Sequence, residues 1–400
     1  MMEEKNILVI AYAMPEPDKA SGDLRLFTVL EMLCGFARVS MVLRDISAWR
    51  SVTKDYQRYE RLLTDAGVEI MVDGVYAALV AKRYEMVFFE FYHPAAEFGK
   101  LVRYLQPDAR QVIDSVDVHF NRLASKARLT GNANDIAEAD AIRTAELSTY
   151  HDADLVVVVS EDDRQLIHGA LTDRAITVLP NVHELHDRPE QESREYGRMV
   201  FVGSFRHTPN IDAMLYFVGE VMPIIREQVP NARLSIIGSH PPSEIIALAA
   251  ADIDVLGYVP DTKPYLQSAY ISIAPLRYGG GLKGKVGEAM SHGLPVITTS
   301  FGAEGFGLIP DQHLLVADSN IMFADAVVRV LADKRLHESL SQAGHQFIAE
   351  HYSRGAMELR IAEFLNQAKE IRPAKVSLAS RLAYKSRKFY DRHFGWRRVR

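Results

Sequence analysis

A glycine-rich segment with two lysines and a glutamate is the part of this sequence whose residue types and spacing best suit a chemical role. It reads APLRYGGGLKGKVGEAMSHGLPVITTSFGAEG from Ala274 to Gly305. An apolar run ends at Pro275, three glycines follow, and a helix is expected to begin near Lys285. Glycines let the main chain approach a ligand closely, and the free N–H groups at a helix start favour an anion. The segment therefore predicts a turn that binds an anionic group, for which a diphosphate is suitable.

Charged side chains in this segment strengthen the prediction. Lys283 and Lys285 lie at the expected start of the helix, where the positive end of the helix dipole disfavours cations. An anion bound beside them would offset that repulsion. Glu288 follows one helical turn after Lys285 on the same face, where it could accept hydrogen bonds from sugar hydroxyls.

Two other interpretations of the same glycines stay open. Gly279-x-Gly281-x-x-Gly284 has the spacing of a dinucleotide-binding fingerprint, with an acidic residue, Glu304, 20 residues further on. That fingerprint normally occupies the first turn of its sheet and leaves the pyrophosphate to main-chain N–H groups, whereas this one follows a late strand and contains lysines. A turn with only a structural role would explain the glycines, but not the lysines together with Glu288.

The elements that must position this segment alternate between strand-like apolar runs and amphipathic helical stretches. In the first half, strands are expected at Ile7–Ala11, Val39–Leu43, Met86–Glu90, Gln111–Asp114, Leu155–Ser160 and Ala175–Leu179. In the second half, they are expected at Met199–Val202, Arg233–Ile237, Ile253–Leu256, Ile271–Ala274, Pro295–Thr299 and His313–Val316. The helices expected between them include Leu24–Gly35, Ala137–Tyr150, Ile211–Gln228, Lys285–His292, Ile321–Ala332 and Leu336–Tyr352. This alternation predicts an α/β fold with two Rossmann-like parallel sheets.

A polar, acid-rich stretch from His183 to Arg198 separates the two halves and is interpreted as a linker. The predicted organisation is an N-terminal domain at 1–182, a linker at 183–198, a C-terminal domain at 199–365 and a basic C-terminal helical extension at 366–400. Ligands of open parallel sheets bind outside the carboxyl ends of the strands. Chemistry is therefore expected in a cleft where the two domains face each other.

Composition narrows the class of protein. The chain of 400 residues is 48% hydrophobic and 24% charged, as in ordinary globular proteins, and its one cysteine excludes a disulfide framework. No apolar run reaches the ~18 residues of a membrane-spanning helix. Glu3 and Glu4 precede the first apolar run, so we expect a cytoplasmic protein without a signal peptide. The net charge of −6 combines an acidic body with a basic tail at 372–400, which argues against general nucleic-acid binding.

Residues Phe201–Tyr352 resemble the C-terminal domain of GT-B-fold glycosyltransferases of family 4, the glycosyl transferases group 1 enzymes. The resemblance is carried, in order, by FVGSFRHTPNIDAM, PNARLSIIGS and VLGYVPDTKPYLQSAYISIAPLRYGGGLKGKVGEAMSHGLPVITTSFGAEG. The first half is similar to the acceptor domain of the same family through ILVIAYAMPEPDKASGDLR and VIDSVDVHFNRL. The resemblance implies the GT-B fold and the transfer of a sugar from a nucleotide-diphosphate donor to an acceptor hydroxyl. It further implies retention of configuration, and a glycan or lipid-linked saccharide as acceptor, as in polysaccharide or cell-envelope biosynthesis.

The resemblance also implies roles for residues of the second half. Glu288 corresponds to the second glutamate of the family's E-x7-E motif, which holds the nucleotide ribose. The first glutamate would fall at position 280, which is a glycine here, so recognition of the donor sugar's hydroxyls is left to main-chain N–H groups. Lys283, Lys285 and Arg206 occupy positions suited to the diphosphate. The other donor-binding candidates are Gly203 and Ser204, the nucleobase loop Gly257, Tyr258 and Val259, and the run Gly279, Gly280, Gly281 and Leu282.

Candidates in the first half lie after two expected strands. Gly22 belongs to the first βα loop, which in this family reaches towards the donor phosphates and the acceptor. His119 follows the strand at 111–114 and matches the family's histidine in the reaction centre, with Asp117 two residues before it. The catalytic candidates are therefore His119, Asp117, Lys285 and Arg206.

A metal site is not predicted. The triplets Asp152-Ala153-Asp154 and Asp252-Ile253-Asp254 resemble the Asp-x-Asp of the other glycosyltransferase fold, but each precedes its strand. They would lie at the edge of the sheet away from the ligand, and both are interpreted as solvated strand entrances. No His/Cys cluster has metal-ligand spacing. We expect no cofactor apart from the donor substrate, with protein cations in place of Mg²⁺ at the diphosphate.

Two interpretations of the basic tail at 372–400 stay open, and so do two alternatives to the predicted function. The tail has ten Lys or Arg residues, one acid and several aromatic residues. It is interpreted either as a helical extension packed across the N-terminal domain or as an anchor on an anionic lipid surface, on the inner face of the cytoplasmic membrane. The alternatives to glycosyl transfer are a nucleotide-sugar epimerase and a non-catalytic nucleotide-sugar binder of the same fold.

Overall fold

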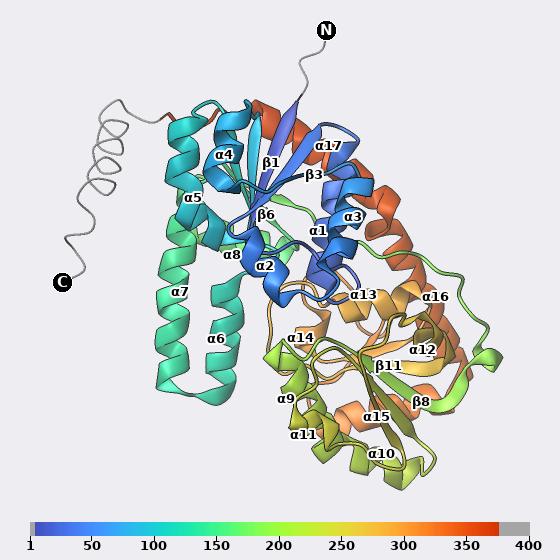
Figure 1. The fold of residues 1–400 in the computed structure, drawn as a ribbon. Coiled ribbons are helices and arrows are strands. Elements are labelled where there is room, and N and C mark those ends of the chain that lie inside the picture. The colour runs from blue at the N-terminus through green and yellow to red at the C-terminus, as the bar shows by residue number, and fades with distance from the viewer. Residues whose placement is uncertain (1–4, 376–400) are drawn as a thin grey trace.

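Two parallel sheets, each with helices on both faces, form the two lobes of the chain in the computed structural model, which describes residues 5–375 (Figure 1). Within those residues the first sheet has seven strands in the order β3-β2-β1-β4-β5-β6-β7, and the second has six in the order β10-β9-β8-β11-β12-β13. All neighbouring strands in both sheets run parallel. The predicted α/β fold with two Rossmann-like sheets is confirmed.

The strands of the first sheet are β1 (Asn6–Ala11), β2 (Arg38–Leu43), β3 (Glu69–Met71), β4 (Met86–Glu90), β5 (Arg110–Asp114), β6 (Leu155–Val158) and β7 (Ala175–Val178). The first-domain helices are α1 (Ser21–Cys34), α2 (Ile46–Val52), α3 (Tyr56–Asp65), α4 (Gly74–Ala81), α5 (Tyr92–Leu105), α6 (His119–Thr130), α7 (Ala133–Asp152) and α8 (Glu161–Ala170). Helices α6 and α7 form an antiparallel pair that projects from this domain beside the second (Figure 1).

The strands of the second sheet are β8 (Glu195–Val202), β9 (Arg233–Ile237), β10 (Ile253–Gly257), β11 (Ala269–Ala274), β12 (Val296–Thr298) and β13 (Leu315–Val316). The helices that follow the linker are α9 (Thr208–Tyr216), α10 (Met222–Gln228), α11 (Ser243–Ile246), α12 (Lys263–Ser268), α13 (Gly284–Ser291), α14 (Ser300–Ala303), α15 (Asn320–Ala332), α16 (Lys334–His351) and α17 (Arg354–Glu370). A 3-10 turn, η1 (Gln191–Ser193), precedes β8, which begins inside the stretch interpreted as a linker.

The structure differs from the prediction at two elements. The helix expected over 211–228 is interrupted by a π-helical turn, η2 (Phe217–Val221), between α9 and α10. Pro223 lies just after this turn, and because proline has no N–H it cannot continue the regular hydrogen-bond ladder. The sequence also gave no sign of β3, a three-residue edge strand whose residues are only partly buried or exposed. A strand so short has no apolar run from which it could be recognised.

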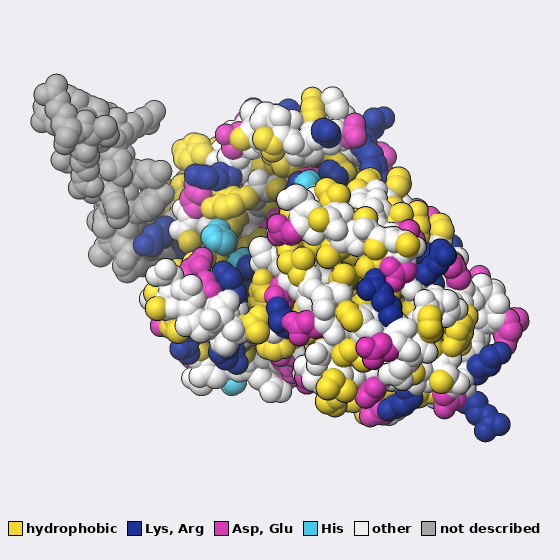
Figure 2. Space-filling model, turned by 90° about the horizontal axis from the view of Figure 1, so that it is seen from below, with side chains coloured by type: hydrophobic (Ala, Val, Ile, Leu, Met, Phe, Trp, Pro, Cys, Tyr) yellow, Lys and Arg dark blue, Asp and Glu magenta, His cyan; other side chains and the backbone are white. Residues whose placement is uncertain are grey.

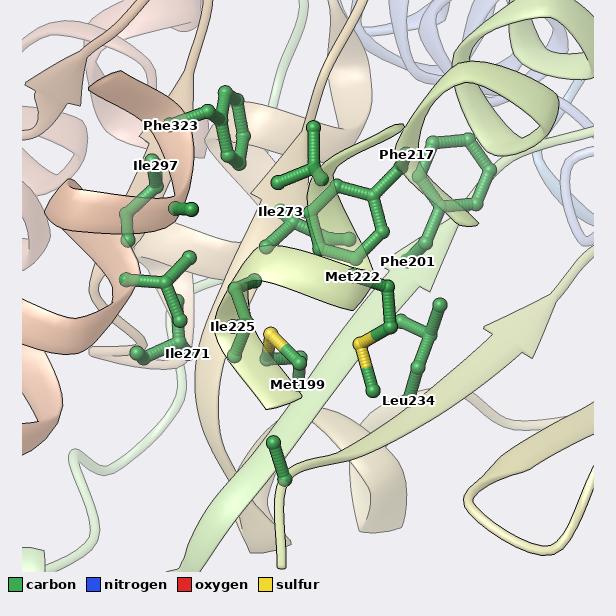
Figure 3. Close-up of a cluster of buried hydrophobic side chains, with 14 of the residues drawn as sticks. Met199, Phe201, Phe217, Met222, Ile225, Leu234, Ile271, Ile273, Ile297 and Phe323 are labelled. Carbon is green, nitrogen blue, oxygen red and sulfur yellow. The ribbon is translucent and has the colours of Figure 1, made fainter. Parts of the chain in front are cut away.

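A core of buried side chains holds the second domain together. Met199, Phe201, Ile271 and Ile273 from the sheet pack against Phe217, Met222, Ile225 and Phe323 from the helices, and each is fully buried (Figure 3). A buried side chain of this size contributes about 1.5–3 kcal/mol by leaving water. This core fixes β8 and β11, the strands from whose carboxyl ends the site is built.

Helix α17 returns from the second domain to the first. Its buried residues Met357, Ile361 and Phe364 belong to the first-domain core, and the Phe364 ring meets Phe88 of β4 edge-on at 6.4 Å. The predicted C-terminal domain range therefore includes most of a helix that packs on the N-terminal domain. The basic tail lies outside the described residues from position 376 onwards.

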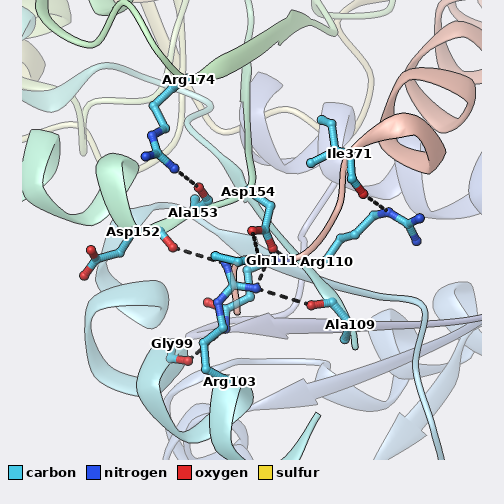
Figure 4. Close-up of polar contacts among 11 residues, drawn as sticks. Gly99, Arg103, Ala109, Arg110, Gln111, Asp152, Ala153, Asp154, Arg174 and Ile371 are labelled. Atoms are coloured by element: carbon cyan, nitrogen blue, oxygen red, sulfur yellow. Dashed lines mark hydrogen bonds and ion pairs between the residues drawn. The ribbon is translucent and has the colours of Figure 1, made fainter. Parts of the chain in front are cut away.

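One interpretation of the Asp-x-Asp triplets is corrected by the structure. Asp154 lies at the N-terminal edge of its strand as predicted, but it is buried rather than solvated. Its carboxylate pairs with Arg103 at 2.6 Å and accepts the main-chain N–H groups of Gln111 and Ala374 at 2.7 and 2.9 Å (Figure 4). Arg110 donates to the Ile371 carbonyl nearby at 2.8 Å. Asp154 thus anchors the end of the described chain to the first domain.

The surface carries charges of both signs. On the face shown in Figure 2, Lys and Arg side chains are interspersed with Asp and Glu. Among the helices of residues 5–375, none is both long and apolar enough to cross a bilayer. Within the same residues, no group of three His, Cys, Asp or Glu side chains is placed to hold a metal ion.

Candidate functional site at the domain interface

The glycine run lies between β11 and α13 and packs closely against the first domain. A methyl group built at Gly280 would overlap Asp117 Oδ1, and one built at Gly284 would overlap the side chain of Ser21. At Gly281 the backbone is left-handed, with φ of 58°, and an added Cβ would lie 3.3 Å from the Val116 carbonyl. The glycines are required because the two domains approach each other so closely here.

Lys285 is a half-buried cation whose hydrogen-bond partner is neutral. Its Nζ donates to the Asn210 side-chain oxygen at 2.9 Å and lies 5.4 Å from the centre of the Phe201 ring. Burial, with nearby Lys283, lowers the pKa of this ammonium group to about 8. Gly203 makes room for the side chain, because a Cβ there would lie 3.0 Å from Lys285 Cε. A bound anion would relieve this unpaired charge.

Lys283 and Leu282 have different surroundings from Lys285. The Lys283 side chain is buried, and its Nζ pairs with Glu304 Oε2 at 3.2 Å. Leu282 packs in an apolar cluster that also contains Val159 of the first domain. The acid that completed the dinucleotide spacing therefore neutralises a lysine of the same segment.

Glu288 links α13 to the start of α12. Its carboxylate accepts a hydrogen bond from Thr262 Oγ1 at 2.6 Å. Burial raises the pKa of Glu288, while Thr262 and Lys285 oppose that rise. Glu288 therefore lies between the lysine of α13 and the loop predicted to meet the nucleobase.

The predicted nucleobase loop also contacts the first domain. Gly257 is left-handed, with φ of 68°, and Tyr258 donates from its hydroxyl to Asp18 Oδ2 at 2.9 Å. Val259 packs in the same apolar cluster as Leu282. The first-domain partner, Asp18, is also held by Arg58 at 3.0 Å.

The segment after β8 presents the remaining second-domain candidates. Arg206 is exposed, and its guanidinium lies 3.1 Å from the His240 ring. Asn210 donates to the Ser204 carbonyl at 2.6 Å with its amide nitrogen, while its amide oxygen holds Lys285. Sequence reasoning missed Asn210, although it stands in the quoted run FVGSFRHTPNIDAM.

His119 is the first residue of α6 and belongs to a cluster of rings. Its imidazole lies 5.4 Å from the ring of Phe91, 5.5 Å from Tyr92 and 5.3 Å from His93. Its own main-chain N–H donates to Glu146 at 3.1 Å. The imidazole is one-fifth exposed, and its Nδ1 has no hydrogen-bond partner in the part of the chain that the structure describes.

Glu146 was missed by sequence reasoning. It is completely buried on α7, where it accepts the N–H groups of His119 and Phe120 and the hydroxyl of Tyr150 at 2.6 Å. It thereby caps α6 from another helix and fixes the backbone of His119. No sequence signal could have found it, because the two residues are 27 positions apart.

A second group of acids lies at the carboxyl ends of β4 and β5 and in the first turn of α1. Asp114 pairs with the buried Arg25 at 2.6 Å. Burial, with Asp23 and Asp114 nearby, raises the pKa of Glu90 well above its usual value. Burial also raises the pKa of Asp23 to about 6. Gly22, predicted in the first βα loop, is instead the second residue of α1, and a Cβ there would lie at an ordinary contact distance, 3.5 Å from Val116.

The fold that results is shared with known glycosyltransferases. Sucrose-phosphate synthase from Thermosynechococcus elongatus superposes with a TM-score of 0.71 over 91% of this chain and 99% of that one, at 16% identity. HepE from Anabaena, solved in complex with UDP, superposes with a TM-score of 0.65 over 90% of this chain and 100% of that one, at 12% identity. The chain therefore has the GT-B fold.

The sequence comparisons match part of the chain to one family. Residues 197–333 match the family described as glycosyl transferases group 1. A Klebsiella pneumoniae protein described as an uncharacterized 44.6 kDa protein in the cps region is 26% identical over 163 residues, which cover 38% of this chain and 42% of that protein. A GDP-mannose-dependent phosphatidylinositol monomannoside mannosyltransferase from Mycolicibacterium smegmatis is 26% identical over 258 residues, 58% of this chain and 67% of that protein.

Proposed function

We propose that the protein transfers a sugar from a nucleoside-diphosphate sugar to an acceptor hydroxyl. The observation that carries this proposal is Lys285. Its ammonium group lies in the first turn of α13, one residue after Gly284, which contacts Ser21 of the first domain, and among residues 5–375 it has no carboxylate within ion-pair distance. A desolvated cation beside free helix N–H groups is suited to a diphosphate.

The main barrier in this reaction is charge separation, because the sugar becomes oxocarbenium-like while the diphosphate gains negative charge. Lys285 and the N-terminus of α13 would stabilise that charge, with exposed Arg206 reaching it from β8. Such preorganised groups are worth roughly 3 kcal/mol each. Lys283 is held by Glu304, so it would contribute only where the ligand competes for its ammonium group.

The rest of the site would hold the nucleoside and the acceptor. Glu288 is placed to accept the ribose hydroxyls, and the Gly257–Val259 loop to meet the base. From the first domain, the one-fifth exposed imidazole of His119 would bind a hydroxyl of either sugar. Contact between the domains would exclude water from the reaction centre, and their separation would admit substrates.

The finer features are proposals as well. We propose retention of configuration, no metal at the diphosphate, and a glycan or lipid-linked saccharide as acceptor. The names of the cps-region and mannosyltransferase relatives support the last of these. The product's anomeric configuration, read by NMR, tests retention, and activity in excess EDTA tests metal independence. We also propose a cytoplasmic enzyme that binds anionic membrane through residues 372–400. The full chain should then bind anionic vesicles better than a chain ending at Ile371.

Thermal stability in the presence of ligands tests the donor site. The purified protein is heated with UDP-, GDP-, ADP- and TDP-sugars, with NAD and with inorganic phosphate. One nucleotide sugar is expected to raise the melting temperature, since ligand at a hundredfold excess over its Kd adds about 2.7 kcal/mol. Lys285→Ala and Glu288→Ala should remove the shift. Lys334→Ala, which removes an exposed lysine from the first turn of α16, should keep it.

Other outcomes of these experiments would indicate a different function. A shift with NAD alone would favour the dinucleotide interpretation of the glycines. Conversion of the nucleotide sugar without any acceptor would indicate an epimerase, and tight binding without turnover would indicate a binding protein. A putative UDP-N-acetylglucosamine 2-epimerase from Listeria monocytogenes superposes with a TM-score of 0.56 at 14% identity, which shows only a shared fold.

A further inference from the structure

Asp117 presents an unpartnered carboxylate oxygen at the domain interface. It lies in the loop between β5 and α6, and its Oδ2 is held by Arg122 Nε at 2.6 Å. The other oxygen, Oδ1, is buried and has no hydrogen-bond partner anywhere in residues 5–375. A buried acceptor left in this state costs about 1–3 kcal/mol, so such an atom marks a place where a donor group can be gained on binding.

This oxygen faces the glycine run of the other domain. A methyl group at position 280 would overlap Asp117 Oδ1 and would lie 3.0 Å from Arg122 Cβ. The carboxylate of Asp117 therefore occupies the space into which a side chain at 280 would project. The family resemblance implies a glutamate of the second domain at position 280, whereas this chain has a glycine there and a carboxylate of the first domain beside it.

Charged side chains of both domains lie near Asp117. Burial, with Lys285 and Arg122 nearby, lowers the pKa of His207, while Asp117 opposes that fall, so His207 lies within electrostatic range of these three side chains. Arg122 neutralises much of the charge of Asp117 through Oδ2, which leaves Oδ1 free to accept from a neutral hydroxyl. Lys285 is paired with an amide rather than with Asp117.

We propose that Asp117 Oδ1 accepts a hydrogen bond from a hydroxyl of the donor's sugar and so helps to select that sugar. The proposal rests on the function proposed above. It replaces the expectation that main-chain N–H groups alone read the sugar hydroxyls. It also divides recognition between the domains: the second binds the nucleoside diphosphate, and the first contributes the carboxylate that distinguishes a nucleotide sugar from its nucleoside diphosphate.

Calorimetric titration of the full chain separates these two contributions. The probes are the nucleotide sugar that stabilises the protein and the corresponding nucleoside diphosphate. Asp117→Asn is expected to lower affinity for the nucleotide sugar by about tenfold or more, because a hydrogen bond to a charged group contributes about 1.5–3 kcal/mol. Affinity for the nucleoside diphosphate should change by less than about threefold.

Asp162→Asn is the matched control. Asp162 also lies on the first domain and accepts an N–H of the second, that of Gly305, at 3.0 Å. Loss of a contact that only holds the domains together should alter both affinities by the same factor. If Asp117→Asn behaves in this way, or changes neither affinity, Asp117 is a closure residue and the proposal is wrong.

Relocating the carboxylate provides a second test that does not depend on one substitution. Gly280→Glu alone should destabilise the protein, because its Cβ overlaps Asp117. Asp117→Ala removes the obstruction, so Asp117→Ala combined with Gly280→Glu should fold and regain at least part of the preference for the nucleotide sugar. A double variant that folds and binds the nucleoside diphosphate without that preference would overturn the proposal. If no nucleoside diphosphate binds the wild-type protein, the proposed function itself fails.

Discussion

The two faces of the domain interface are built in opposite ways. The second-domain face comes mainly from one continuous segment, in which Gly280, Lys285 and Glu288 lie within nine residues and on one loop and helix. The first-domain face comes from separate points of the chain, among them Ser21, Asp117 and Val159. A continuous segment can be recognised as a motif, whereas a face assembled from several separate segments cannot.

The comparisons with known proteins follow the same division. The family match covers 197–333 and none of the first domain. A nucleoside diphosphate offers the same charges and hydroxyls in every donor, so one local pattern can serve many enzymes. We expect substitutions in the second domain to act on nucleotide binding and substitutions in the first to act on turnover and sugar choice.

The largest expected effect belongs to His119. His119→Gln should lower the release of nucleoside diphosphate from a bound nucleotide sugar by about 100-fold, as expected for a group that contacts the reacting atoms. Affinity for the nucleoside diphosphate should stay within about threefold, because that ligand binds the other domain. His168→Gln, on the exposed end of α8, is the control and should change neither quantity. Equal losses in binding and turnover would contradict the division between the faces.

Lys285 should show the opposite behaviour, with lost binding and gained stability. In the fold its pKa is about 8 against 10.5 ordinarily, so at pH 7 the buried charge destabilises the protein by about 3 kcal/mol, and its hydrogen bond to Asn210 offsets about 1. Lys285→Met should therefore raise the free energy of unfolding by about 2 kcal/mol at pH 7.

The pH dependence of Lys285→Met follows from the same pKa shift. Between pH 8 and 10.5 the unfolded chain binds more protons at this site than the folded one, so the wild type gains about 3 kcal/mol on the variant, and above pH 10.5 it should be the more stable of the two by about 1 kcal/mol, the contribution of the hydrogen bond to Asn210. Urea unfolding of both proteins at several pH values measures it. An unchanged difference across that range would show that the amine is not desolvated.

Gly287 tests the contact between α13 and the connection from the first domain. A methyl group there would overlap the ring of buried His183, so Gly287→Ala should destabilise the protein by about 1–2 kcal/mol. Because His183→Ala removes the ring, Gly287→Ala should cost little in that background. If Gly287→Ala lowers the free energy of unfolding equally in both backgrounds, its effect does not come from the contact with His183. Denaturant unfolding of the four proteins completes the cycle.

Substitution of Gly22 should have the smallest effect on stability. It tests whether a residue of the first domain also contributes to nucleotide binding. An added Cβ would meet Val116 at an ordinary 3.5 Å, so Gly22→Ala should change the free energy of unfolding by less than about 0.5 kcal/mol. If the donor phosphates approach the start of α1, where Gly22 lies, affinity of Gly22→Ala for the nucleoside diphosphate should still fall by about tenfold. Unchanged affinity would confine the nucleotide to the second domain, which would sharpen the comparison.

Much of the architecture could be predicted because both sheets are parallel and buried. Their strands contain continuous apolar runs, such as Ile7–Ala11 and Leu155–Val158, and intervening helices carry one apolar face. The exceptions were β3, which is too short to show a pattern, and the π-helical turn before Pro223. Solvent exposure of Asp154 was predicted wrongly because its partner Arg103 lies on a helix 51 positions earlier.

The sequence by itself determined the two α/β units, the glycine run and the spacing that puts Lys285 and Glu288 on one helical face, since each depends on residues close together in the chain. Only the tertiary structure decided which charges remain available. It paired Lys283 with Glu304, left Lys285 with an amide, capped His119 with Glu146 and set Asp117 against Gly280. The physical reason is that burial and pairing depend on neighbours in space, and here those neighbours come from the other domain or from distant parts of the chain.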